Sequence, residues 1–171
     1  MMGRSLLLVG ALATAGVAVA AGLGYGLKSP ADAGMPRHVV VALAATLALM
    51  FSHSWILIYL AGTGKVIRDA AREGGLGPAV LAESGRLRRI CYPAILLAVL
   101  MVLAAFLAGG AVATKAAEPW VHHLLFWIAI VLQAGALALE SWGLAANERL
   151  LVDVDRRLAE ARPAAAVPAG A

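Results

Sequence analysis

His53 is an ionisable side chain inside a mostly apolar stretch, LMFSHSWILIYLAGTGK, which occupies residues 49–65. An imidazole changes charge near neutral pH and can also supply a ring nitrogen to a metal, so this residue type suits proton transfer or haem ligation. A charged side chain near the centre of a bilayer costs roughly 2.5 to 3.5 kcal/mol on insertion scales. We therefore expect His53 to face other polar groups or a wet cavity and not lipid.

Further polar or soft side chains are expected at a similar depth. At about 1.5 Å of rise per residue, His53 lies roughly 13 Å from the cytoplasmic end of its helix. By the same rise, four other side chains lie about 9 to 19 Å from that side of the membrane: Thr14, Met101, Gln133 and Glu140. Gln133 and Glu140 are seven residues apart, which places them on one face of a helix. The sequence predicts a buried polar layer of Thr14, His53, Gln133 and Glu140.

Three functions are compatible with this layer. The polar side chains can hydrogen-bond across helices and fix their packing, at about 0.6 kcal/mol per bond. His53 can instead bind a metal or a b-type haem, with Met101 as the second axial ligand. In the third function, Glu140 and His53 relay protons for a transport or redox partner. The adjacent His122 and His123 lie roughly 20 Å higher, so we expect them at the outer interface, with a surface metal or a quinone as the alternative role.

The elements that must position these residues are membrane-spanning helices. The chain of 171 residues is 62% hydrophobic and 14% charged, whereas soluble domains are roughly 45 to 50% apolar and about 25% charged. Four apolar runs each reach the roughly 20 residues that cross a bilayer: residues 5–27, 38–62, 91–113 and 120–146. They lack the alternation of barrel strands. The sequence predicts an all-α, integral membrane four-helix bundle.

Basic residues predict its orientation. Of the 14 Lys and Arg residues, 11 lie in the N-terminus, residues 63–90 and the tail, and only Lys28, Arg37 and Lys115 lie on the other side. Because basic residues are retained in the cytoplasm, both termini are expected there, in a bacterial-type inner membrane. This asymmetry accounts for the net charge of +4 without a nucleic-acid partner, since anionic lipid headgroups suffice.

Residues 1–162 are expected to form one transmembrane domain. Residues 63–90 are expected to be a cytoplasmic loop with two short helical pieces broken by glycines 74, 75 and 77, and helix 120–146 should continue into the cytoplasm to residue 161. The tail 163–171 is expected to be disordered.

The first helix is expected to be retained. Although Ala18 to Ala20 resembles a signal-peptide cleavage site, apolar residues continue to Leu27. Small residues spaced by four predict its packing seam: Gly10, Thr14, Ala18, Gly22 and Gly26.

Several functions are disfavoured by the motifs. The segment GTGK at 62–65 lacks the rest of a phosphate-binding loop, so no nucleotide is expected. Ser52 and Ser54 diverge from His53 on a helix, which argues against a hydrolase. The single cysteine, Cys91, is interpreted as an apolar filler. We therefore expect that the chain is not an enzyme. We expect it to be an accessory or scaffold subunit of a larger membrane assembly, or to form a homo-oligomer.

Overall fold

The structure is a computed structural model that describes residues 2–29 and 31–161. These residues form four helices and no strand: α1 (Met2–Tyr25), α2 (Met35–Glu73), α3 (Pro78–Ala113) and α4 (Pro119–Ala161). Each helix is long and apolar enough to cross a membrane. The prediction of an all-helical chain with four candidate membrane spans is confirmed. The predicted disordered tail, residues 163–171, lies outside the described residues.

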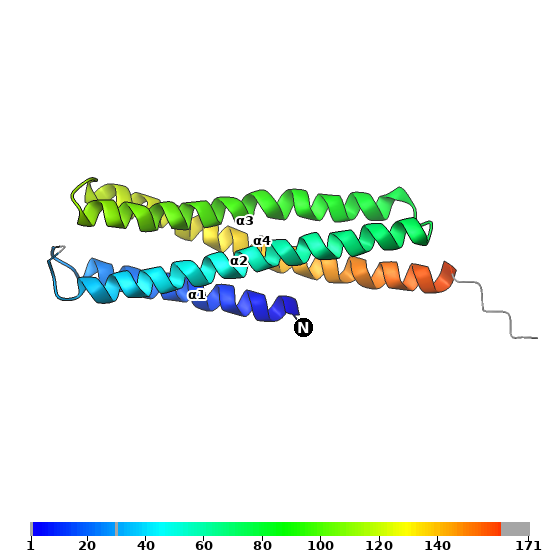
Figure 1. Cartoon of the computed structure of the whole chain (residues 1–171), viewed down its shortest axis with the longest axis horizontal. Coiled ribbons are helices and arrows are strands. Elements are labelled where there is room, and N and C mark those ends of the chain that lie inside the picture. The colour runs from blue at the N-terminus through cyan, green and yellow to red at the C-terminus, as the bar shows by residue number, and fades with distance from the viewer. Residues whose placement is uncertain (1, 30, 162–171) are drawn as a thin grey trace, which may run out of the picture.

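The helices form two antiparallel hairpins that lie side by side (Figure 1). In one hairpin α1 packs against α2, and in the other α3 packs against α4. Helix α2 also contacts α3 and α4, and α1 contacts α4, so α2 is the main link between the hairpins. The connections α1–α2 and α3–α4 lie at one end of the molecule, whereas the α2–α3 connection and the end of α4 lie at the other (Figure 1). We call these ends the outer and the inner end.

At the inner end the structure differs from the predicted loop at 63–90. Helix α2 continues to Glu73 and α3 begins at Pro78, so only residues 74–77 separate the two helices. The glycine break is where the sequence placed it, with Gly75 at φ +62°. However, residues 79–90 are not a separate surface piece but the first turns of α3, which continues through Pro93.

An apolar cluster explains why these helices extend. Ile67 of α2, Val80 of α3 and Val154 of α4 are buried against one another at the inner end. Partly buried side chains surround them: Ala70, Leu76, Leu150, Leu151 and Leu158. Because burying an aliphatic side chain stabilises a fold by roughly 1.5 to 3 kcal/mol, this three-helix contact holds the chain helical beyond the apolar spans.

The packing seam of α1 also differs from the predicted one. Gly10 is buried, but Ala18 and Gly22 are exposed, and a Cβ added to Gly22 would meet nothing within 4 Å. Steps of four residues rotate about 40° around a helix with each step, so the predicted ladder turns away from its neighbour. The buried face instead follows a spacing close to 3.5, as expected for helices that cross at a shallow angle: Leu6, Gly10, Ala13 and Ala20.

Candidate functional site

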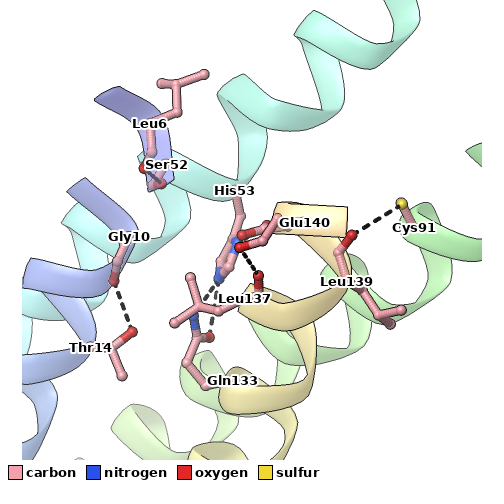
Figure 2. Close-up of polar contacts among 11 residues, drawn as sticks. Leu6, Gly10, Thr14, Ser52, His53, Cys91, Gln133, Leu137, Leu139 and Glu140 are labelled. Atoms are coloured by element: carbon pink, nitrogen blue, oxygen red, sulfur yellow. Dashed lines mark hydrogen bonds and ion pairs between the residues drawn. The ribbon is translucent and has the colours of Figure 1, made fainter. Parts of the chain in front are cut away.

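His53 of α2 lies directly against two polar side chains of α4 (Figure 2). Its Nδ1 is 2.5 Å from Oε1 of Glu140, and its Nε2 is 3.0 Å from Oε1 and 2.8 Å from Nε2 of Gln133. All three side chains are buried, with exposed fractions of 0% for His53 and Glu140 and 1% for Gln133. We call these three residues the buried triad. Gln133 and Glu140 are two helical turns apart on one face of α4, so each contacts a different nitrogen of the His53 ring.

The amide of Gln133 can serve His53 in either protonation state. A neutral ring that donates from Nδ1 to Glu140 has a lone pair on Nε2, which accepts from the NH₂ group of Gln133. A protonated ring donates from Nε2 instead, and the Oε1 atom of Gln133 accepts. Since both amide atoms lie within hydrogen-bond distance of Nε2, the triad can hold or release a proton without moving a helix.

Glu140 has a second oxygen that the triad does not use. Among the buried side-chain atoms of the described residues, Oε2 of Glu140 and Nδ2 of Asn147 have no hydrogen-bond partner. Oδ1 of Asn147 accepts a bond from Thr63 at 3.2 Å, so that side chain is partly satisfied. A buried carboxylate oxygen without a hydrogen-bond partner is costly.

Thr14 and Met101 lie elsewhere. Thr14 is half-buried and donates to the carbonyl of Gly10 in its own helix at 2.8 Å. Met101 packs against an apolar cluster: Ala13, Leu49, Val102, Ala105 and Ala129. The structure therefore brings together His53, Gln133 and Glu140 of the predicted polar layer, whereas Thr14 bonds within α1. Both ring nitrogens of His53 are already in hydrogen-bond contact, so an iron ligated there would displace Glu140 or Gln133.

Ser52 forms a separate buried contact beside the triad. Its hydroxyl donates to the backbone carbonyl of Leu6 at 2.9 Å (Figure 2). A Cβ added to Gly10, four residues after this acceptor, would lie 3.1 Å from the Ser52 hydroxyl. The Ser52 hydroxyl therefore bonds α2 to α1 and does not donate to His53, as a nucleophile activated by that histidine would.

His38 was not predicted as a site residue, and His122 was predicted at the outer interface, with a surface metal or a quinone as its alternative role. Each is the fourth residue of a helix that follows an outer connection, His38 in α2 and His122 in α4. Nδ1 of His38 is 2.8 Å from the carbonyl oxygen of Ala20, and Nδ1 of His122 is 2.8 Å from that of Ala105. The sequence feature that could have indicated both residues is their equivalent position, a histidine in the first turn of the helix after each outer connection.

A pocket of about 480 Å³ lies between the hairpins at the outer end, and all four helices line it. His38 and His122 line this pocket, whereas the buried triad does not. His123 also reaches it, and its ring makes an edge contact with Tyr25 at 5.1 Å between centroids. Within residues 2–29 and 31–161, no group of three or more His, Cys, Asp and Glu side chains could hold a metal ion.

Comparison of the chain with protein-family models, with curated proteins and with solved structures found no match. Two features of the chain itself bear on its function. One is the buried triad between α2 and α4, and the other is the histidine-lined pocket at the outer end.

Proposed function

We propose that this chain is a four-helix bundle of a bacterial-type inner membrane, with both termini in the cytoplasm. We propose further that it serves as an accessory or scaffold subunit of a larger membrane assembly, or assembles as a homo-oligomer. The observation that carries this proposal is the buried triad, because it joins α2 of one hairpin to α4 of the other through fully buried polar groups. Together with the bonds from Thr63 to Asn147 and from Tyr92 to the carbonyl of Leu57, such contacts specify one arrangement of two hairpins that also meet in apolar clusters.

The basic residues support the orientation. By the bounds of the helices, the basic residues toward the inner end include Lys65, Arg72 and Arg89, whereas Lys28, Arg37 and Lys115 lie in or beside the outer connections. Orientation is testable with Glu73→Cys and Ala116→Cys, both exposed in the connections or beside them, in a Cys91→Ala background. In spheroplasts, a membrane-impermeant maleimide should label Ala116→Cys without permeabilisation. Glu73→Cys should react only after permeabilisation, and the reverse pattern would overturn the orientation.

The scaffold function predicts a defined assembly. The tagged full chain, extracted from its native membrane in mild detergent, should migrate as a particle well above its 17.5 kDa mass. The same chain produced alone in a foreign host distinguishes the two forms: a homo-oligomer keeps that size, whereas an accessory subunit loses it. A monomer in both preparations, confirmed by cross-linking in the membrane before extraction, would refute the proposal.

Proton handling is the second candidate, and the unpartnered Oε2 of Glu140 favours it. In this function Glu140 and His53 exchange a proton that is coupled to a partner's transport or redox cycle. The variant Glu140→Gln separates the candidates because it keeps the size of the side chain and its capacity to accept from His53. A scaffold retains both assembly and the activity of that assembly in this variant. A proton-handling subunit retains assembly but loses the activity.

A further inference from the structure

We infer that the outer pocket binds a b-type haem whose iron is ligated by Nε2 of His38 and Nε2 of His122. This site is separate from the buried triad, so it goes beyond the proposed function and does not depend on it. His38 comes from the hairpin of α1 and α2, and His122 from the hairpin of α3 and α4. The two ligands thus approach one pocket from the two halves of the molecule.

The hydrogen bonds of both rings leave Nε2 free to bind a metal. A backbone carbonyl can only accept, so Nδ1 of His38 must donate to Ala20 and Nδ1 of His122 must donate to Ala105, at 2.8 Å each. A neutral imidazole protonated on Nδ1 has its lone pair on Nε2. Metal-binding histidines are commonly fixed in this manner, by donating the other ring nitrogen to a carbonyl or carboxylate.

A glycine sets the position of each ring. A Cβ added to Gly24 would lie 2.8 Å from Cε1 of His38, and a Cβ added to Gly109 would lie 3.1 Å from Cε1 of His122. Gly24 and Gly109 each come four residues after the carbonyl that the ring contacts. The same local contact thus occurs once in each hairpin, and both copies line the same pocket.

The pocket suits a large flat ligand with an apolar body and an anionic edge. Its volume of about 480 Å³ lies within the roughly 300 to 1,000 Å³ of ligand pockets. Small residues leave room along its walls, and Phe106 and Phe126 offer rings for apolar contact. Lys28, exposed in the connection after α1, lines the same pocket. Its ammonium group is suited to the carboxylates of the haem propionates at the membrane surface.

Iron porphyrin fits these residues better than a bare metal ion does. The described residues offer no group of three or more His, Cys, Asp and Glu side chains for a metal ion. A porphyrin supplies four nitrogen ligands in one plane, so two imidazoles complete the coordination of the iron. Two histidines from different helices that line one apolar pocket provide this remaining pair.

The test uses the full chain in mild detergent, titrated with haemin, and its absorbance spectrum before and after dithionite. The wild type should bind about one haem per chain and show a Soret band that shifts on reduction, with the sharp visible bands of six-coordinate, low-spin iron. His38→Ala and His122→Ala should each weaken haemin binding by at least about tenfold, since loss of even an outer-shell partner of a metal ligand has an effect of about 10- to 100-fold. His123→Ala is the matched control: it removes the neighbouring imidazole but neither proposed ligand, so it should weaken haemin binding far less than His122→Ala does. Val66→Ala, exposed at the inner end and outside the pocket, should bind as the wild type does.

His38→Met and His122→Met guard against variants that fail to fold. Methionine is an axial haem ligand, so each should keep haem and change the position of the spectral bands. The inference is overturned if the wild type leaves the haemin spectrum as it is in empty micelles. It is equally overturned if the iron is five-coordinate, or if binding is lost in His123→Ala and kept in His38→Ala and His122→Ala. Quinone binding to the pocket without haem binding would also overturn it.

Discussion

Replacing Glu140 with leucine while His53 remains should destabilise the chain more than replacing both residues together. The single change leaves an imidazole buried at 0% exposure without the carboxylate that its Nδ1 contacts at 2.5 Å. Removal of one partner from a buried pair typically costs about 3 to 5 kcal/mol. Replacement of both partners by apolar residues of similar volume is often neutral. In the double variant only Gln133 loses its partner, a loss of about 0.6 kcal/mol for a bond between membrane helices.

A double-mutant cycle measures this difference. The variants His53→Leu, Glu140→Leu and the combination are unfolded reversibly in mixed micelles of mild and denaturing detergent, and the free energy of unfolding is obtained for each. We expect the double variant to lie within about 1 kcal/mol of the wild type and the coupling energy to exceed about 2 kcal/mol. Glu140→Gln, which still accepts from His53, should lose only about 1 kcal/mol. If the two single losses add to within about 0.5 kcal/mol in the double variant, the pair does not act as a unit and the reasoning fails.

Two further stability predictions use matched pairs of residues. Gly24→Ala should lower the free energy of unfolding by about 1 to 3 kcal/mol, because its Cβ would lie 2.8 Å from the ring of His38. Gly22→Ala, whose Cβ would meet nothing within 4 Å, should be neutral or stabilising. Equal losses in the two variants would contradict the packing of α1 on α2. Ile67→Ala should lose about 2 to 5 kcal/mol by opening a cavity at the inner end, whereas Val66→Ala, at 59% exposure, should stay within about 0.5 kcal/mol. Detergent unfolding of each pair decides both, and a loss in Val66→Ala as large as that in Ile67→Ala would refute the three-helix core.

The number of helices could be predicted from the sequence because the apolar runs are long and separated by turn residues. The ends of α2 and α3 at the inner end could not be predicted in the same way. Hydropathy marks where charged residues begin, at about Lys65, but helix formation there depends on side chains that pack between α2, α3 and α4. Ile67 lies among charged neighbours and Val80 follows the turn glycines, and only the assembled structure shows that they are buried with Val154.

The buried triad could be anticipated in part because depth and spacing are readable along a helix. Gln133 and Glu140 share a face whatever the neighbours are, and an intramembrane histidine requires a polar partner. Rotation of a helix about its own axis, however, is fixed only by packing. Thr14, predicted for the same layer, therefore donates to Gly10 of its own helix, and Met101 packs in an apolar cluster.

Four contacts between helices of this chain share one physical origin. In each, a side chain donates to a backbone carbonyl, and the residue four positions after the acceptor is glycine. The donors are Ser52, His38, His122 and Cys91, the last of which reaches the carbonyl of Leu139 beside Gly143. A helical carbonyl has a second lone pair that the next turn's side chain normally covers, and glycine leaves it open.

This shared contact gives the first hairpin a fixed register. The donors His38 and Ser52 are 14 residues apart on α2, and their acceptors Ala20 and Leu6 are 14 residues apart on α1. A one-residue slip of α1 along α2 would break both bonds. The glycines of α1 therefore do more than permit close approach, because they make the helix backbone itself the acceptor that aligns its neighbour. The same alignment holds the ring of His38 at the pocket that His122 enters from the other hairpin.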